Sequence, residues 1–363
     1  MIKKKKILIG AVDVGWRIDS YKKLIEKELR NTHEVISYSK FKLPEAHYKT
    51  DFDFAFQQAD KSKFGSYLLS FVYFIKFLFI VDIFHFISGE TLLTRKLRLF
   101  EFFILKLFTK KIIMHVVGTD IRSVESILWK EKNIFSFLKG KADYPYSLDW
   151  QKKMIADSQS YADEILVSTA DLLKVIPKAS YFPVMIDLNS FLMELSKQKF
   201  NKRTDKITIL HAPSNVKMKG STIIHKVLKE IAREHEDIEI VLTHELKRKT
   251  NSVYTVSRYE LFKLYQESDI VVDQLVIGWY GLQSIEAILS KNATICYIEA
   301  DLTQYLQPNC PIINANAINL KEVLLNTIEK IRKKEIDFND QVEWVKGYHT
   351  LENQKQHLLN IWK

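Results

Sequence analysis

The chain has 363 residues, of which 47% are hydrophobic and 27% are charged. This length allows two domains of ordinary size, and this composition excludes a disordered chain and one embedded throughout in a membrane. Lys and Arg outnumber Asp and Glu by 54 to 44, and the resulting net charge of +10 suits nucleic acid, anionic lipid or phosphorylated substrates alike.

The start of the chain predicts a strand and not a signal peptide. Four lysines precede the apolar run 7–12, but the run is short, ends at Asp13 and lacks a small-residue cleavage site. The two cysteines, Cys296 and Cys310, form no disulfide framework, which fits a reducing compartment. We therefore expect a cytoplasmic protein.

The N-terminal half alternates between strand and helix patterns. Short apolar runs that fit strands lie at 6–11, 34–38, 82–87, 111–117 and 164–168. Stretches of helical length separate these runs, and the first begins with the helical spacing of Tyr21, Leu24 and Ile25. A parallel sheet covered by helices is expected, in a Rossmann-like domain over 1–193.

The longest apolar tract covers residues 67–81. Lys76 interrupts it and Asp82 ends it, whereas a membrane-spanning helix needs about 20 mainly apolar residues. We interpret the tract as a buried helix followed by a strand.

The segment 94–111 combines an apolar run, Leu99 to Phe108, with basic flanks. Its basic residues are Arg95, Lys96, Arg98, Lys106, Lys110 and Lys111. The pattern fits a helix on an anionic membrane surface, and equally a mostly buried helix with solvated ends. On the first interpretation the protein is peripheral on the inner face of the cell membrane. Nucleic acid is not an expected partner, because no binding motif accompanies the charge.

Residues 194–206 are polar and highly charged, as expected of a linker. The strand and helix alternation then restarts and predicts a second Rossmann-like domain over 207–338, followed by a helical segment, 339–363, that can cross back to the first domain. Ser257 opens one of its helices with a capping box to Glu260. Ligands of such sheets bind beyond the carboxyl ends of the strands, so we expect the active site in a cleft between the domains.

Two segments of the second domain fit phosphate binding. The segment 211–221 (HAPSNVKMKGS) runs from a strand into a helix, with Gly220 allowing close approach and Lys219 adding positive charge. The alternative is a plain strand-to-helix turn. The segment 273–287 (DQLVIGWYGLQSIEA) has two glycines before a helix, on which Glu286 could accept hydrogen bonds from sugar or ribose hydroxyls.

These motifs, in this order, resemble the retaining glycosyltransferases of GT-B fold, especially the large glycosyltransferase family 4 and its relatives. The N-terminal half contributes HVVGTDIR at 115–122, and the run ADEILVSTADLLKVIP followed by FPVMIDLNSF resembles the approach to the family's linker. The resemblance covers most of the chain. It implies an α/β protein with two Rossmann-like domains whose parallel sheets face a central cleft. On this resemblance, the domain over 1–193 binds the acceptor and the domain over 207–338 binds the nucleotide sugar.

The resemblance also implies roles for individual residues. The implied catalytic residues are His115, Asp120 and Arg122. The implied donor-binding residues are Gly15, Ser214, Asn215, Lys219, Gly220, Gln274, Gly278, Trp279, Tyr280, Gly281 and Glu286. The nucleotide sugar would be a substrate, and no cofactor or metal is expected.

Several positions depart from the family pattern. Gly278 stands where the first of two glutamates is common, and Val216 where an arginine is common. Lys291 and Ala293 replace a usual Gly and Pro, and Val117 replaces a histidine that often precedes the glycine of the N-terminal motif. The residues therefore support donor binding more strongly than catalysis.

Other site chemistries have little support in the sequence. Asp51 and Asp53 form a DFD triplet like that of metal-dependent glycosyltransferases, but they lie in a polar stretch of a Rossmann-like domain. No zinc spacing, nucleophile elbow or P-loop occurs.

The resemblance implies a hexosyltransferase-type enzyme that transfers sugar from a nucleotide sugar to a saccharide or lipid-linked acceptor, in bacterial surface polysaccharide or glycoconjugate synthesis. Two alternatives remain. One is a nucleotide-sugar epimerase of the same fold, and the other is a non-catalytic nucleotide-sugar-binding partner subunit.

Overall fold

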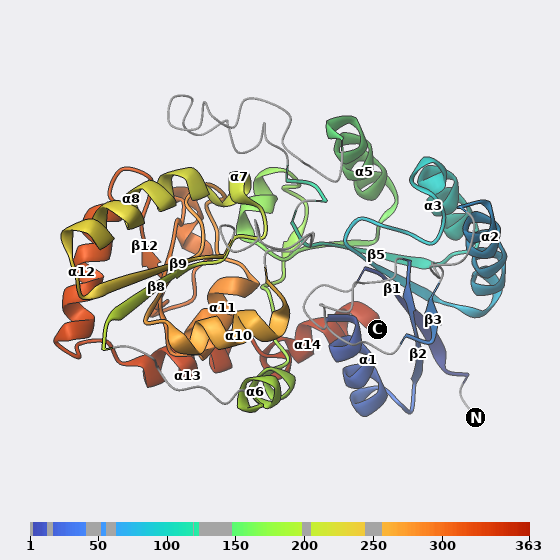
Figure 1. Ribbon diagram of the computed structural model, residues 1–363. Coiled ribbons are helices and arrows are strands. Elements are labelled where there is room, and N and C mark those ends of the chain that lie inside the picture. Colours follow the sequence, from blue (N-terminus) through green and yellow to red (C-terminus); the bar gives the residue numbers. More distant parts are fainter. Residues whose placement is uncertain are drawn as a thin grey trace. The chain divides into compact units, whose positions relative to one another are not determined.

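The computed structural model describes residues 3–12, 17–40, 52–55, 63–118, 120–122, 147–197, 205–243 and 256–363. These residues form two compact units, coloured in chain order in Figure 1. The first unit takes the described residues up to 187 together with 354–363, and the second takes those from 188 to 353. Gly15 and Asp51 lie outside the described residues.

The first unit contains a parallel sheet of seven strands in the order β3-β2-β1-β4-β5-β6-β7. Its strands are β1 (Lys5–Ala11), β2 (His33–Ser39), β3 (Phe54–Ala55), β4 (Ile83–Ile87), β5 (Lys111–Val116), β6 (Glu164–Val167) and β7 (Ser180–Tyr181). β1 and β4 are nearly or wholly buried along their length, as expected of parallel strands with both faces covered.

Helices cover both faces of this sheet. They are α1 (Arg17–Glu28), α2 (Lys63–Ile80), α3 (Arg98–Leu107) after the short η1 (Arg95–Leu97), α5 (Leu148–Tyr161), η3 (Ala170–Lys174) and the C-terminal α14 (Leu351–Trp362). Side chains alternate along β4 between the two faces of the sheet. His85 contacts Tyr21 of α1 and Trp362 of α14. Phe84 and Phe86 pack on the other face, in the core shared with α2 and α3.

The tract 67–81 does form a helix, α2, but the prediction that this helix is buried is wrong for one of its faces. Phe74 and Phe77 are buried, whereas Leu68 and Val72 are exposed. An apolar pattern cannot show which side of a helix will be covered when nearly every position is apolar. Of the helices in the described part of the chain, none is long and apolar enough to cross a membrane.

The second unit contains a parallel sheet of five strands in the order β12-β11-β10-β8-β9. Its strands are β8 (Ile207–His211), β9 (Ile238–Leu242), β10 (Ile270–Val272), β11 (Ala293–Cys296) and β12 (Ile313–Asn314). Its helical elements are α6 (Leu188–Ser196), α7 (Val216–Lys219), α8 (Ser221–Glu234), α10 (Arg258–Glu267), α11 (Leu282–Leu289), η4 (Ala300–Tyr305), α12 (Leu320–Arg332) and α13 (Phe338–Tyr348). The strands and helices expected from the sequence are confirmed, including the capping box of Ser257 and Glu260.

The boundary between the units falls before α6, ahead of the position 193 expected from the sequence. Phe191 of α6 packs edge-on against Phe262 of α10, with ring centroids 5.2 Å apart, which places α6 in the second unit. The end of α14 belongs to the first unit, where the Lys111 ammonium donates to the Ile361 carbonyl at 2.6 Å.

Candidate functional site

The order of strands in the second unit indicates a ligand site at the carboxyl ends of two neighbouring strands, β8 and β10. β8 pairs with β9 on one side and with β10 on the other, so the chain reverses direction across the sheet between β8 and β10. In open parallel sheets, the crevice outside the carboxyl ends of the strands at such a switch point is the usual ligand site. The segments that follow β8 and β10 are the two that carry the predicted donor-binding residues.

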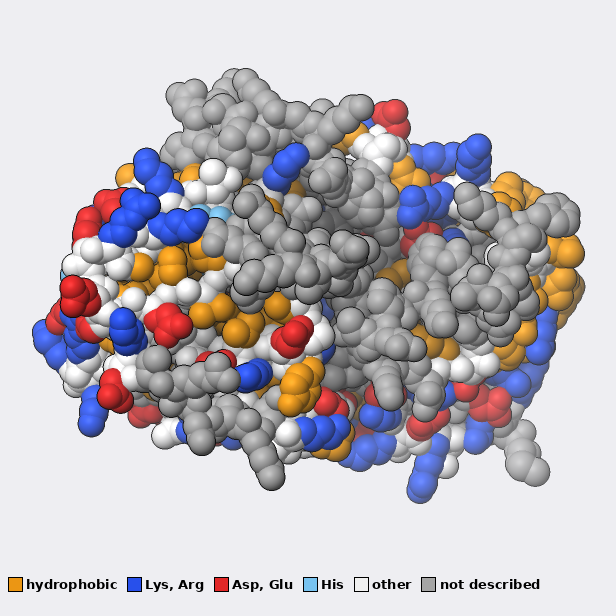
Figure 2. All heavy atoms as spheres, viewed as in Figure 1, with side chains coloured by type: hydrophobic (Ala, Val, Ile, Leu, Met, Phe, Trp, Pro, Cys, Tyr) orange, Lys and Arg blue, Asp and Glu red, His pale blue; other side chains and the backbone are white. Residues whose placement is uncertain are grey.

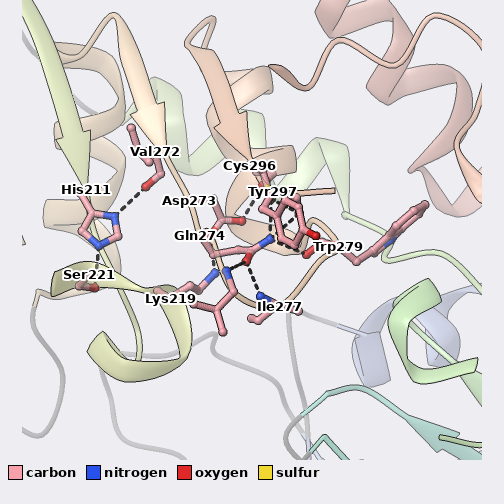
Figure 3. A network of polar contacts seen from close by, with 12 residues as sticks. His211, Lys219, Ser221, Val272, Asp273, Gln274, Ile277, Trp279, Cys296 and Tyr297 are labelled. Atoms are coloured by element: carbon pink, nitrogen blue, oxygen red, sulfur yellow. Dashed lines mark hydrogen bonds and ion pairs between the residues drawn. The ribbon is translucent and has the colours of Figure 1, made fainter. Parts of the chain in front are cut away.

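These two segments are bonded to each other. The Leu275 amide donates to the Lys219 carbonyl at 3.1 Å, and the Lys219 ammonium pairs with the buried Asp273 carboxylate (Figure 3). Ser284 donates its hydroxyl to the other oxygen of Asp273 at 2.6 Å. Lys219 therefore lies at the end of α7 with its side chain 12% exposed.

Gly220 is required by the packing of the two segments. Its φ is 72°, a region that L-residues with side chains rarely occupy. A Cβ atom there would lie 2.9 Å from Cγ2 of Val276. The sequence predicted that Gly220 allows a ligand to approach the backbone closely. In the structure, the group that approaches it closely is Val276 of the segment after β10.

Asn215 and Ser214 precede α7. The Asn215 side chain accepts hydrogen bonds from the Lys217 and Met218 amides at 3.1 and 3.0 Å and so caps this short helix. Ser214 is exposed. Asn215 therefore has a structural role, whereas the Ser214 side chain lies at the surface of the loop.

Gln274 braces the loop after β10 from inside. Its side-chain oxygen accepts from the Val276 and Ile277 amides at 2.7 and 2.6 Å. Its amide nitrogen donates to the Trp279 and Tyr297 carbonyls at 3.3 and 2.8 Å (Figure 3). These bonds fix the backbone of the predicted donor-binding loop. The Gln274 side chain is buried, and its polar atoms bind the protein itself.

The aromatic pair of the same loop is also buried. Trp279 and Tyr280 stack with ring centroids 5.0 Å apart, and the Tyr280 hydroxyl lies 3.2 Å from Nε2 of His349. Both rings are buried in the core, so they anchor the loop to the interior of the unit.

The two glycines of the loop have different environments. Gly278 has a φ of 84°, which gives a conformational reason for glycine at this position, and its carbonyl accepts from the Glu299 amide at 3.0 Å. Gly281 precedes α11, and nothing lies within 4 Å of where its Cβ would be. Neither α8 nor α11 has a side-chain cap at its start, the position at which helices bind anions.

Glu286 lies in α11 and is 1% exposed. Both of its oxygens are engaged by the Arg258 guanidinium, and the Tyr265 hydroxyl donates to the carboxylate at 3.4 Å. The sequence analysis missed Arg258 as a partner. A ribose hydroxyl would have to share this carboxylate with that guanidinium.

His211 ties β8, β10 and α8 together. Its Nδ1 lies 2.7 Å from the Val272 carbonyl, which can only accept, so Nδ1 donates and Nε2 accepts from the Ser221 hydroxyl at 2.7 Å. Burial lowers the pKa of His211 from 6.5 to about 3, which keeps the ring neutral. The motif residue at 211 thus has a structural role.

The predicted catalytic residues of the first unit are buried around the segment after β5. His115 lies 3.0 Å from the Ser168 hydroxyl, and burial lowers its pKa well below the ordinary value. Asp120 accepts from the Val117 and Gly118 amides at 2.9 and 2.7 Å, and burial raises its pKa.

Arg122 is paired within the same unit. Its guanidinium donates to both oxygens of Asp171, at 2.7 and 3.0 Å, and to the Thr169 hydroxyl at 2.9 Å. Together with the bonds of Asp120, this pairing holds the backbone at 117–118 and 120–122 in place. The geometry favours positioning roles for these side chains.

The sequence analysis also overlooked Arg17, at the start of α1 next to the switch point between β1 and β4. Its side chain is buried, and its charge adds to the effect of burial in lowering the pKa values of His85 and His115. Its Nη1 has no hydrogen-bond partner among the described residues. Asp53, in contrast, holds the sheet edge by accepting from the Ser37 amide and pairing with Lys22, both at 2.8 Å.

The chain matches no protein-family model and no curated protein. It is similar over almost its whole length to solved structures. Sucrose-phosphate synthase from Thermosynechococcus elongatus is 11% identical, with 99% of this chain and 98% of that one covered and a TM-score of 0.61. HepE from Anabaena, in complex with UDP, is 10% identical with 98% of each chain covered and a TM-score of 0.57.

A protein from Listeria monocytogenes assigned as a UDP-N-acetylglucosamine 2-epimerase is also similar, with 11% identity, coverage of 98% and 94%, and a TM-score of 0.54. Identities this low establish the fold alone. The chain has the GT-B fold of two Rossmann-like domains, and the predicted fold class is confirmed.

Proposed function

We propose that this protein is a glycosyltransferase that moves a sugar from a nucleotide-sugar donor onto a saccharide or lipid-linked acceptor, with retention of configuration. One observation carries the proposal: at the β8/β10 switch point, Lys219 and the uncapped starts of α8 and α11 belong to two segments that are bonded to each other. On the resemblance alone, we place the reaction in surface polysaccharide or glycoconjugate synthesis.

The leaving group in such a reaction is a nucleoside diphosphate, whose negative charge grows as the bond to the sugar breaks. The Lys219 ammonium and the helix-start amides would stabilise this charge by electrostatic preorganisation, without a metal. The acceptor oxygen attacks the anomeric carbon, the bond from that carbon to the phosphate oxygen breaks, and the acceptor proton passes to that phosphate. No separate base is then required.

His115, Asp120 and Arg122 would contribute to the proposed reaction by shaping the backbone after β5. Their side chains already bind neighbours within the first unit, such as Ser168 and Asp171. Loss of any of them should therefore lower turnover through a displaced loop, and the donor affinity should change less than the turnover.

The proposal is tested first by thermal shift with UDP-, GDP-, ADP- and CMP-sugars. A ligand that binds only the native state raises the unfolding temperature once its concentration exceeds its dissociation constant. We expect one nucleotide to stand out, and UDP is the first choice because HepE is described in complex with UDP. No shift with any nucleotide sugar at saturating concentration would refute the proposal.

Lys219 provides the residue-level test. Lys219→Ala should weaken binding of the nucleoside diphosphate by about tenfold or more, because a hydrogen bond to a charged group contributes roughly 1.5–3 kcal/mol. Lys217→Ala, which removes an exposed charge from the same short helix, is the matched control and should leave the affinity nearly unchanged.

Lys219→Ala also strands the buried Asp273 carboxylate, which is expected to reduce stability. The double variant Lys219→Ala/Asp273→Asn removes that unpaired charge. If the affinity stays low in the double variant, Lys219 contacts the diphosphate. If the affinity returns to the wild-type value, Lys219 serves only to neutralise Asp273 and the assignment is wrong.

The fold is shared with the protein assigned as an epimerase, so the assay must separate the two reactions. A transferase turns over its donor in proportion to an acceptor. Conversion of the nucleotide sugar without any acceptor would favour an epimerase. Donor binding without turnover, with activity restored by a second protein, would favour a partner subunit.

A further inference from the structure

Two neighbouring helices of the first unit expose a large apolar surface. The described large hydrophobic side chains of α2 and α3 that are more than half exposed are Tyr67, Leu68, Val72, Phe79, Phe103 and Leu107, and we call the surface around them the α2–α3 face. Phe79 is 67% exposed and Leu107 65%. Figure 2 shows hydrophobic side chains gathered at the right-hand edge of the molecule, over these helices.

The exposed residues are not needed to attach the helices to the sheet. α2 packs into the core through Phe74, Phe77 and Leu78, and α3 packs through Phe102 and Leu105. These inward residues recur at helical spacing, so the exposed residues form a second stripe on the outer side. Exposed apolar patches of this kind mark interaction surfaces, because a monomer gains nothing by leaving them in water.

The two stripes join into one surface. The rings of Phe79, at the end of α2, and Phe108, just after α3, meet edge-on with centroids 5.7 Å apart. The apolar surface therefore continues from one helix to the next.

Among the described residues of 63–110, the exposed charges without an opposite partner have one sign. Lys76 and Lys96 are exposed and Lys110 is half-exposed, and none of the three has a carboxylate partner among the described residues. The carboxylates of residues 63–110 point elsewhere: Glu90 and Glu101 are buried, and Asp82 accepts from the Lys6 amide at 2.8 Å. The face thus combines apolar side chains with cations.

We propose that the α2–α3 face docks on an anionic lipid bilayer, with its aromatic and aliphatic side chains in the interfacial layer and its lysines among the headgroup phosphates. Apolar area plus attraction to anionic lipid is what holds interfacial helices on membranes. A symmetric pairing of two copies fits less well, because it would bring like charges together around the same patch. This proposal does not depend on the chemistry of the donor site.

Sedimentation with phosphatidylcholine vesicles, with and without phosphatidylglycerol, tests the proposal on the full chain. We expect binding to the anionic vesicles that declines as salt screens the headgroup charge. Phe79→Ser/Phe103→Ser should lower the partition coefficient by about tenfold or more, since burying an aromatic side chain is strongly favourable. The matched control, Met193→Ser/Ile318→Ser, removes residues that are 53% and 77% exposed in the second unit and should bind like wild type.

The electrostatic part is tested with Lys96→Glu/Lys110→Glu, which should abolish the preference for anionic vesicles. Lys330→Glu/Lys333→Glu changes the net charge equally at exposed positions of the second unit and should retain that preference. Equal recovery of wild type in the supernatant with and without anionic lipid would overturn the proposal.

Sedimentation equilibrium tests whether the α2–α3 face binds a second copy of the chain instead of a membrane. Self-association that the Phe79/Phe103 variant loses, without vesicle binding by wild type, would assign the face to a dimer and refute the membrane proposal. Unfolding temperature and nucleotide affinity are measured on the same preparations. The unfolding temperature and the nucleotide affinity should not change in the variants. A failure of the membrane proposal is therefore distinguishable from a failure of the proposed enzyme activity.

Discussion

Glu286 is predicted to bind the donor ribose, and the structure shows how its carboxylate is held. The carboxylate is buried and held by Arg258, so it is neither a solvated helix residue nor an empty acceptor. Removing either partner leaves a buried charge without its counter-ion, which is strongly destabilising. A loss of stability alone therefore cannot show that Glu286 binds ribose.

We predict that Glu286→Gln weakens the ribonucleotide more than its 2′,3′-dideoxy analogue, because a carboxylate accepts from both hydroxyls and an amide replaces one acceptor with a donor. Arg258→Gln is the matched control, since it breaks the same ion pair but keeps the carboxylate. Both affinities and the unfolding temperature are measured for each variant. If the two variants lose affinity equally for both nucleotides, Glu286 is purely structural.

Within an element, the α7–α8 junction depends on one glycine. We predict that Gly220→Ala lowers the free energy of unfolding by about 1–2 kcal/mol or more, because a left-handed alanine is strained. The new Cβ would also meet Val276 and displace the donor loop, so nucleotide affinity should fall as well.

Gly347→Ala is the control for this substitution. Gly347 lies exposed in α13, and nothing occupies the space around its Cβ position. Alanine there should raise the free energy of unfolding by about 0.5–1 kcal/mol, because glycine loses more backbone entropy in a helix. Urea unfolding of the two variants gives both values, and a neutral Gly220→Ala would contradict the account of the junction.

At the scale of the whole molecule, buried neutral histidines occur in both units. Burial lowers the pKa values of His85 and His211 from 6.5 to about 3, and it lowers that of His115 well below the ordinary value. Arg17 adds to the shifts of His85 and His115. The unfolded chain therefore binds protons at these positions at a pH where the folded chain does not.

We predict that stability is lost as the pH falls below about 6.5, by about 1.4 kcal/mol per pH unit for each such histidine. Because the folded pKa values lie below the unfolded ones, the contribution is complete above the unfolded value and declines towards pH 3. Urea unfolding from about pH 7 to about pH 5.5 measures this dependence before most carboxylates titrate. Equal or greater stability at the lower pH would contradict it.

The sequence by itself determined the succession of strands and helices. The period of apolar residues and signals such as the Ser257 capping box act within a few residues, so they can be recognised locally. The order of motifs also indicated the GT-B fold, which the structure comparisons confirm. Lys219 was recognised as a candidate because its setting, a strand followed by a helix start, is local as well.

Only the tertiary structure decided which groups face one another. Lys219 meets Asp273 across 54 residues, because the paired strands β8 and β10 end side by side. Arg258 meets Glu286 across 28 residues, because α10 packs against α11. The exposure of the outer face of α2 could not be predicted from the sequence either, because almost every position of that helix is apolar. Only the placement of the sheet decides which side of the helix is covered. Pairing and burial depend on how segments far apart in the chain pack, and no local pattern contains that information.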